Sequence, residues 1–172
     1  MKALVTGFDP FGGDAVNPSA QAVALLPRRL GALAIETAVL PTSYARSAAV
    51  LRAAIDRVRP DLVLCVGQAG GRTELSLERV GINVQDARIR DNDGAGTFVC
   101  NHILYALMDM AQDHPAAFRG GFLHIPYVPE QAARLGGAPS MAVADIARGI
   151  GIILEVSART GADLQTAEGQ IS

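Results

Sequence analysis

Short apolar runs and segments of helical periodicity alternate along the 172 residues of this chain. The apolar runs are rich in residues that favour strands, whereas the intervening segments repeat small and apolar residues at helical spacing. Strands are predicted at residues 2–6, 34–40, 61–67 and 120–126, and helices at 18–26, 44–59, 98–112 and 141–156. The run at 61–67 is apolar throughout, which is typical of a central strand buried on both faces.

This alternation predicts an α/β fold in which an open, twisted, mostly parallel sheet carries helices on both faces. Residues 74–84 alternate apolar and polar side chains, which indicates an extended segment or a hairpin. No repeat, low-complexity tract or linker divides the sequence, so residues 1–172 are expected to form a single domain.

The predicted helices begin beside residue types that cap helices. Such side chains accept hydrogen bonds from backbone N–H groups of the first turn, which otherwise lack partners. The expected caps are Asn17, with Pro18 at the first helical position, then Thr42 or Ser43, Thr97 and Ser140.

Composition narrows the classes of function. Apolar residues make up 49% of the chain and charged residues 19%, which excludes a disordered chain or a coiled coil. The net charge is −2 without any dense Lys/Arg cluster, which argues against binding to nucleic acid or to a membrane surface. The apolar stretch 146–156 is too short to span a bilayer, and the N-terminus does not read as a signal peptide. A cytoplasmic, reducing location is therefore expected.

Cys100 is the candidate nucleophile. With Thr97 as N-cap it lies in the first turn of a helix, where free N–H groups and the helix dipole stabilise negative charge. This setting is expected to lower the thiol pKa, to favour the thiolate and to offer N–H groups to an oxyanion. The alternative is a small buried side chain, which is the interpretation of Cys65 in the strand 61–67. The two cysteines match neither a disulfide framework nor a zinc-binding spacing.

His124 is the candidate base, at the end of a predicted strand, where ligand sites of open parallel sheets form. Alone in an apolar run it would be a core residue. His102 is interpreted as helix surface and His114 as a C-terminal helix cap. A Cys–His pair needs a third group that orients the imidazole. Spacing along the chain leaves four candidates open: Glu74, Glu78, Asp86 and Asp91.

The glycine-rich loop TGFDPFGG at residues 6–13 is not a dinucleotide motif. It lacks the G-x-G-x-x-G pattern, and no acidic residue follows at the required distance. Two of the five phenylalanines of the chain, Phe8 and Phe11, lie in this loop. They either line a small pocket or plug the end of the sheet.

Taken together, these segments resemble the pyroglutamyl peptidase I (pyrrolidone-carboxylate peptidase) family of cysteine peptidases. The matching segments are TGFDPFGG followed by NPS, VGQAGGR, ERVGIN, DARIRDNDG, GTFVCN and GGFLHIPYVPEQ. They occur in the family's order and extend from residue 6 to residue 131. The resemblance implies a thiol protease that hydrolyses pyroglutamate from peptide N-termini, without metal or cofactor, as a homo-oligomer (dimer or tetramer).

The resemblance also implies roles for individual residues. The family's Glu–Cys–His triad matches Glu78, Cys100 and His124, which selects Glu78 among the four acids. Arg88 matches an arginine near the oxyanion. The pocket for the lactam ring matches Phe8, Phe11, Asn17, Gln68, Ile89, Phe98 and Val99.

The chemistry of pyroglutamate fits these residue types. Its flat, neutral lactam could lie between phenylalanine rings, with Asn17, Gln68 or loop backbone bonding its amide. An ordinary charged N-terminus would lose its hydration there without gaining a partner, which disfavours it. In the implied mechanism the Cys100 thiolate attacks, His124 protonates the leaving amine, and water releases pyroglutamate.

The chain departs from the family pattern at one junction. The family carries a further helix and strand before the GTFVCN helix, whereas here Gly94 is followed directly by Ala95. The sequence either omits residues or carries a true deletion, and omission is favoured because a deletion would expose core. A true deletion predicts a shortened sheet, an exposed apolar patch beside the Cys100 helix and, as an alternative function, a non-catalytic binder of pyroglutamyl peptides. A phosphate- or nucleoside-handling enzyme ranks last, because no basic phosphate cradle is present.

Overall fold

The computed structural model describes residues 1–83, 91–93, 99–113 and 117–160. These residues form six strands and five helices, in agreement with the predicted α/β class. In chain order the elements are β1 (Lys2–Phe8), α1 (Pro18–Ala24), β2 (Arg29–Leu30), β3 (Leu33–Leu40), α2 (Tyr44–Val58), β4 (Leu62–Gln68), β5 (Ser76–Glu78), α3 (Val99–Asp113), β6 (Arg119–Ile125), α4 (Pro129–Arg134) and α5 (Val143–Arg159).

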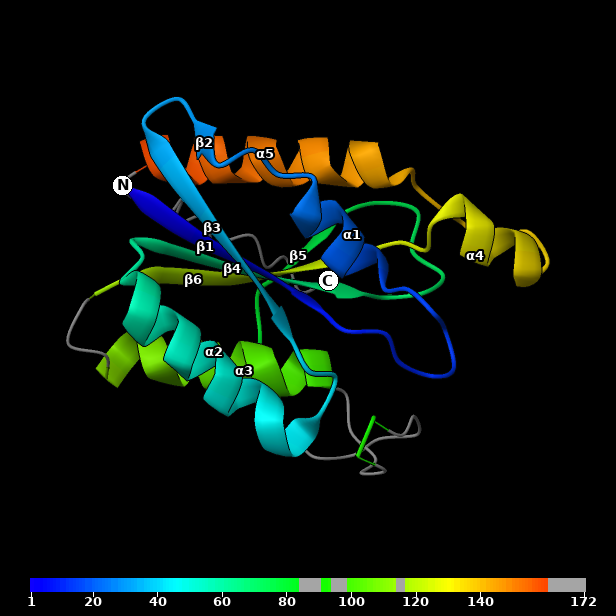
Figure 1. Cartoon of the computed structure of the whole chain (residues 1–172), viewed down its shortest axis with the longest axis horizontal. Helices are drawn as coiled ribbons and strands as arrows, with labels where there is room; N and C mark the ends of the chain where they lie inside the picture. Colours follow the sequence, from blue (N-terminus) through cyan, green and yellow to red (C-terminus); the bar gives the residue numbers. More distant parts are fainter. Residues whose placement is uncertain (84–90, 94–98, 114–116, 161–172) are drawn as a thin grey trace, which may run out of the picture.

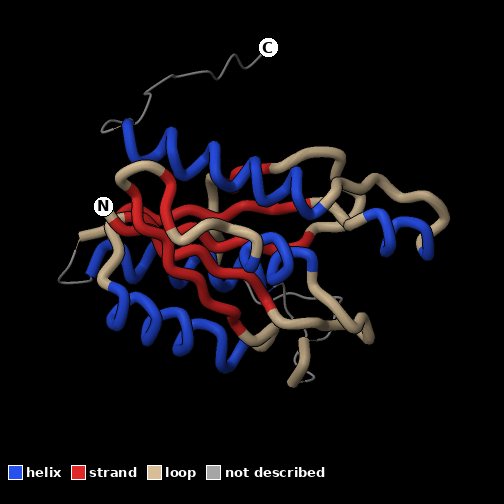
Figure 2. The backbone as a smooth tube through the Cα atoms, turned by 45° about the horizontal axis from the view of Figure 1, so that its top comes forward, coloured by secondary structure: helices blue, strands red, loops and turns tan. Residues whose placement is uncertain are grey.

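The strands form one mixed sheet in the order β2-β3-β1-β4-β6-β5. The four central strands are parallel, and the short strands β2 and β5 pair antiparallel at the two edges. Helices α1 and α5 cover one face of the sheet, and α2 and α3 cover the other (Figure 1). Figure 2 shows the same three layers from a second direction. The predicted mostly parallel sheet with helices on both faces is confirmed.

The central strand β4 is buried on both faces, which explains its continuous apolar sequence. Val63 and Cys65 face the core beneath α2 and α3, while Leu64 and Val66 face the core beneath α1 and α5. On α3 the residues that pack on the sheet recur at helical spacing. They are Val99, Ile103, Leu104, Leu107 and Met110.

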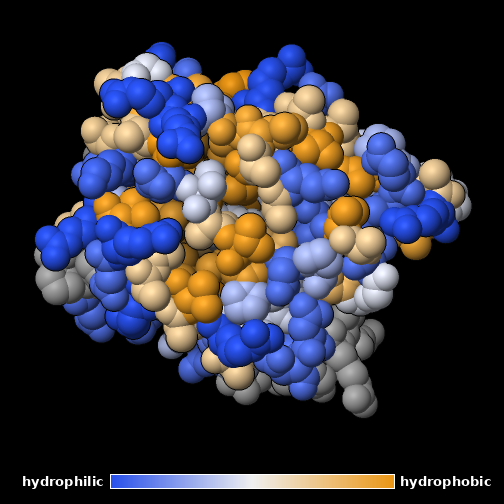
Figure 3. Space-filling view, viewed as in Figure 1, coloured by the Kyte–Doolittle hydropathy of each residue, from blue (hydrophilic) through white to orange (hydrophobic). Residues whose placement is uncertain are grey.

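Helix α5 presents apolar side chains in two directions. Ile146, Ile150 and Leu154 are buried against the sheet, whereas Ile152 and Val156 are 58% and 57% exposed. Figure 3 shows hydrophobic surface over α5 on this face of the molecule. Within the described ranges, no helix is both long enough and apolar enough to cross a membrane.

Two of the predicted helix caps form, and one does not. Asn17 accepts a hydrogen bond from the Ser19 N–H, and Ser43 caps α2 in the same way through the Arg46 N–H. The predicted cap at Ser140 is wrong, because α5 begins only after Ala142, which makes no side-chain cap. Ser140 instead forms a bridge with the chain at 127. The predicted cap at Thr97 lies outside the described residues.

The edge of the sheet beside α3 is short and partly uncovered. Strand β5 has three residues, and Leu77, Val80 and Ile82 on and after it are 56%, 71% and 55% exposed. An exposed apolar surface of this kind is what a true deletion before Ala95 predicts. The junction of Gly94 and Ala95 lies outside the described residues, so the omission of a helix and strand there stays a prediction.

Gly7 permits β1 to pass directly beneath α1. A Cβ at Gly7 would lie 2.7 Å from the Ala20 nitrogen and 2.7 Å from the carbonyl carbon of Ser19, both in the α1 backbone. Backbone cannot rotate aside as a side chain can, so Gly7→Ala should lower the free energy of unfolding by about 2–3 kcal/mol. Urea denaturation measures this loss. Gly121→Ala is the control, since its Cβ would meet only Leu64 at 3.9 Å. Equal losses in both variants would contradict the steric explanation.

Candidate active site

Three side chains from three elements converge on the face of the sheet covered by α2 and α3. His124 comes from the end of β6, Glu78 from the edge strand β5 and Cys100 from the first turn of α3. The register of the sheet places His124 opposite Gly67 of β4 on one side and Ser76 of β5 on the other. Because side chains alternate along a strand, His124 shares its face with Phe122, and their ring centroids lie 4.9 Å apart.

The carboxylate of Glu78 contacts the imidazole directly. Its Oε1 lies 2.6 Å from Nδ1 of His124. The hydrogen bond with His124, and then the charge and hydrogen bond of Arg72, hold the pKa of Glu78 below its ordinary value. An ionised carboxylate only accepts hydrogen bonds, so Nδ1 of His124 carries the proton and Nε2 is left as an acceptor. This is the tautomer that a general base requires.

Cys100 lies in the first turn of α3 and packs, partly buried, against the core between this helix and the sheet. A Cβ at Gly67 would lie 2.7 Å from its sulfur and 2.8 Å from Cζ of Phe122. The thiol therefore occupies space that any side chain at position 67 would take. Since Gly67 is the cross-strand neighbour of His124, the sulfur lies beside the strand position that carries the base.

The close contact between the Cys100 thiol and the His124 imidazole that a Cys–His pair needs stays a prediction. Among the described residues, no hydrogen bond joins Cys100 to His124, whose hydrogen bond goes to Glu78. Catalytic hydrogen bonds of this kind are often long in the free enzyme and tighten only with substrate bound.

Burial sets the protonation states of the Cys100 thiol and the His124 imidazole. It raises the pKa of the Cys100 thiol to about 12, and the neighbouring Cys65 adds to this effect. The prediction that the helix N-terminus lowers this pKa is therefore wrong, because loss of hydration outweighs the helix backbone. Burial likewise lowers the pKa of His124, and the hydrogen bond to Glu78 opposes this effect. The resting pair is a neutral thiol and a neutral imidazole.

The segment that carries Glu78 is attached to the helix that carries Cys100. Asn101 accepts a hydrogen bond from the Ile82 N–H at 3.0 Å and donates one to the Ile82 carbonyl at 2.7 Å. Gly81 lies flat on α3, since a Cβ there would come within 2.9 Å of the Tyr105 nitrogen. This clamp links the ERVGIN and GTFVCN motifs, and the sequence alone gives no sign of it.

Arg72 also belongs to the site, although the sequence analysis assigned it no role. Its Nη2 lies 2.9 Å from Oε1 of Glu78, the same oxygen that contacts His124. The available signal was its position just after a glycine-rich turn at the carboxyl end of a buried strand, where ligand sites form.

The residues predicted to line the pocket differ in their surroundings. Phe8 is 3% exposed and packs in the core, with its ring centroid 6.4 Å from that of Phe122. Val99 is also buried, whereas Phe11 is partly exposed. Asn17 is buried, and its side chain is used in capping α1 and in donating to the Asp9 carbonyl at 2.9 Å.

Gln68 ends β4 and takes part in a short chain of amides. Gln131, which is 2% exposed, donates from Nε2 to the Asp14 carboxylate at 2.8 Å and to Oε1 of Gln68 at 3.2 Å. Gln68 accepts this hydrogen bond through its oxygen, which leaves its NH2 group pointing elsewhere as a donor. Sequence reasoning missed Gln131, because a glutamine in a short helix carries no signal of its own.

Glu78 is the acid in contact with His124 among the candidates that the structure describes. Glu74 is exposed, and Asp91 accepts from the Tyr44 N–H at 2.7 Å on another loop. His102, predicted to lie on the helix surface, packs on Tyr44 with ring centroids 4.0 Å apart. The remaining predicted residues lie outside the described part of the chain: Asp86, Arg88, Ile89, Phe98 and His114.

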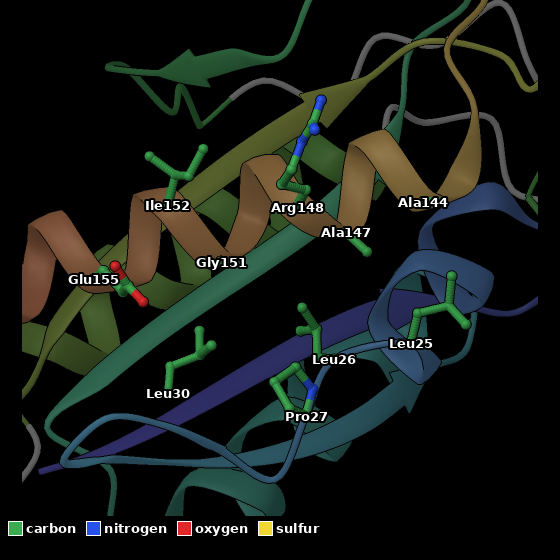
Figure 4. A pocket seen from close by; sticks show the side chains of 10 residues that line it. All are labelled: Leu25, Leu26, Pro27, Leu30, Ala144, Ala147, Arg148, Gly151, Ile152 and Glu155. Carbon is green, nitrogen blue, oxygen red and sulfur yellow. The ribbon is translucent and has the colours of Figure 1, made fainter.

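A separate cavity of about 430 Å³ lies on the opposite face of the sheet, between α1, β2 and α5. Figure 4 shows that leucines from the α1–β2 region and small residues of α5 line it. Arg148 and Glu155 are its two charged lining residues. It contains no nucleophile and no base, so the candidate chemistry stays with Cys100 and His124.

The fold and this site define the class: a cysteine peptidase of α/β architecture, with a thiol near a carboxylate-bound histidine. The chain belongs to the pyroglutamyl peptidase family, whose profile matches residues 1–95 and 93–160. A pyrrolidone-carboxylate peptidase of Alkaliphilus oremlandii is 37% identical, covering 99% of this chain and 100% of that protein. One from Brevibacillus brevis is 40% identical, covering 98% of each chain. The crystal structure of pyroglutamyl peptidase I from Bacillus amyloliquefaciens superposes with a TM-score of 0.90, at 39% identity over 96% of this chain and 99% of that one.

The family match divides at the junction where the sequence departs from the family pattern. The two matched segments meet at residues 93–95. The alignment with the Alkaliphilus protein extends over 212 residues, against 172 in this chain. The relative therefore carries residues that this chain lacks.

Gly67→Ala tests whether the glycine makes room for the nucleophile. The added methyl would displace the Cys100 sulfur, and a displacement of about 1 Å costs on the order of a hundredfold in rate. We expect that loss in kcat/KM, measured on a chromogenic pyroglutamyl amide. Gly121→Ala, on the other face of the sheet, serves as the control. An unchanged kcat/KM in folded Gly67→Ala would show that the close approach is irrelevant to catalysis.

Proposed function

We propose that this protein is a cysteine exopeptidase that hydrolyses the N-terminal pyroglutamyl residue of peptides. The observation that carries the proposal is the hydrogen bond of 2.6 Å between Glu78 and His124, beside the thiol of Cys100. In this proposal Cys100 is the nucleophile, His124 the base and Glu78 the group that orients it. The membership of the chain in the pyroglutamyl peptidase family supports the substrate.

The protonation states define the order of the proton transfers. The thiol is neutral at rest, so Nε2 of His124 takes its proton as sulfur attacks the carbonyl carbon. The ionised Glu78 stabilises the imidazolium that forms. His124 then gives the proton to the leaving amine, and a thioester with Cys100 remains. Water, deprotonated by His124, attacks this thioester, and the returning proton restores the thiol and releases pyroglutamate.

The pocket for the lactam ring is proposed at the carboxyl ends of β1 and β4. Phe11 supplies a partly exposed ring, while buried Phe8 and Val99 form the floor. The NH2 group of Gln68, whose oxygen accepts from Gln131, is a donor that suits the lactam carbonyl. The family pattern adds Asn17, which lies at the α1 cap, and Arg88, Ile89 and Phe98, with Arg88 beside the oxyanion. A charged α-amino group entering such a pocket would lose hydration without a matching acid.

A cytoplasmic location and a homo-oligomeric state, dimer or tetramer, complete the proposal. Both cysteines are free, which fits a reducing compartment. The exposed apolar side chains on α5, Ile152 and Val156, offer surface for self-association.

The two cysteines provide a matched test of the nucleophile. Cys100→Ala should abolish hydrolysis of pyroglutamyl-7-amido-4-methylcoumarin, because no other thiol lies beside His124 among the described residues. Cys65→Ala should keep kcat/KM within about tenfold, because it removes only one core atom group. The 7-amido-4-methylcoumarins of glutamine and of proline, which carry a charged amino group, serve as the substrate control and should not be hydrolysed. Retained activity in Cys100→Ala, or equal loss in both variants, would refute the proposal.

The pH dependence of kcat/KM should report His124. Since burial lowers the pKa of His124, the base stays neutral to a more acidic pH than a free imidazole. Activity should therefore persist at pH 6.5 and fall only at lower pH, as His124 becomes protonated. His102→Gln, outside the site, should leave the profile unchanged. An acid limb above pH 7 would contradict the neutral, buried imidazole.

A further inference from the structure

Arg72 and His124 bind the same oxygen of one carboxylate. Nη2 of Arg72 lies 2.9 Å, and Nδ1 of His124 2.6 Å, from Oε1 of Glu78. The side chains of Arg72, Glu78 and His124 are 38%, 27% and 17% exposed, so the contact lies at the edge of the buried site. If His124 gains a proton, two cations must share one anion.

The loop between β4 and β5 is built to deliver this arginine. Ala69 continues the ladder with β6 by donating to the Ile125 carbonyl at 2.9 Å. Gly70 then passes against the ring of Tyr127, where a Cβ would lie 2.1 Å from the phenolic oxygen. Gly71 has a φ of 83°, which favours glycine and turns the chain toward β5. These three constraints fix the backbone that immediately precedes Arg72.

We propose that Arg72 is a positioning residue of this site, which shares the Glu78 carboxylate oxygen with His124 and thereby opposes the protonation of the imidazole. The inference rests on the proposed function, in which His124 is the base. The ion pair of Arg72 is made to the Glu78 carboxylate, through which it acts on His124.

The electrostatics of the site agree with this geometry. Two charged groups act on His124: the Glu78 carboxylate of β5 and the Arg72 guanidinium of the β4–β5 loop. From α3, the neutral Cys100 thiol lies next to the same part of the sheet. Arg72 lowers the pKa of His124, in addition to burial, and it also lowers the pKa of Glu78. The consequence is a base that remains neutral in mild acid although it is bound to a carboxylate, which alone would favour the imidazolium.

The direct test is an NMR titration of the histidines in the intact protein. The chain has three histidines, so the His124 imidazole signal can be assigned with His102→Gln and His114→Gln variants. In Arg72→Gln the His124 signal should titrate at higher pH than in the wild type. Arg72→Lys, which keeps the charge, should titrate near the wild type. Arg148→Gln, which removes an exposed arginine paired with Asp145, is the control for charge loss elsewhere and should not shift it.

Kinetics provide the second readout. Compared with its plateau, kcat/KM of Arg72→Gln at pH 5.5 should fall on the order of threefold further than kcat/KM of the wild type. Removing the arginine charge shifts the pH at which His124 protonates and so moves the acid side of the profile. Arg72→Lys should restore the wild-type profile. A lower melting temperature with an unmoved His124 titration would assign Arg72 a purely structural role and overturn the inference. So would an equal shift in the Lys and Gln variants.

The outcomes also separate this inference from the proposed function. The titration needs no substrate, so a shift confined to Arg72→Gln supports the electrostatic role even if the wild type fails to hydrolyse pyroglutamyl amides. Hydrolysis with an unmoved titration would support the peptidase and refute the role of Arg72.

Discussion

The parallel pairing of β4 with β6 is the constraint on which the site depends. Its register runs without interruption from Leu62↔Arg119 to Gln68↔Ile125, and it places His124 beside Gly67 at the carboxyl ends of both strands. Only a strand residue without a side chain leaves room there for the Cys100 sulfur. The opposite edge of β6 receives β5, which adds the carboxylate from the other side. One register therefore determines where nucleophile, base and acid can meet, and a slip by a single residue would turn His124 to the other face.

Burial, rather than the helix N-terminus, dominates the electrostatics of the thiol. The first turn of α3 lowers the pKa of Cys100, but desolvation and the adjacent Cys65 raise it further, to about 12. The same burial keeps His124 neutral against the pull of Glu78. In the proposed reaction the neutral thiol gives its proton to Nε2 of His124 as the sulfur attacks the carbonyl carbon. This explains how a weakly acidic thiol is compatible with a cysteine peptidase.

The edge of the sheet at β5 is short and leaves apolar side chains uncovered. Strand β5 has three residues, and the chain around it exposes Leu77, Val80 and Ile82. The clamp of Asn101 on Ile82 nevertheless holds this chain on α3, and the contact of Glu78 with His124 is kept. The described polar contacts of the site are thus formed beside an edge of the sheet that leaves apolar side chains exposed.

The sequence by itself determined the alternation of strands and helices, the parallel core and the cap at Asn17, and it left Thr42 and Ser43 open for the next cap. Through family resemblance it proposed the set Glu78, Cys100 and His124. These features depend on local periodicity and on contiguous motifs, which can be seen along the chain. Only the tertiary structure decided the protonation of the thiol, the shared carboxylate oxygen of Arg72 and the amide chain through Gln131. Each of these depends on burial or on a contact between residues distant in sequence, and neither desolvation nor a cross-strand distance is encoded in local pattern.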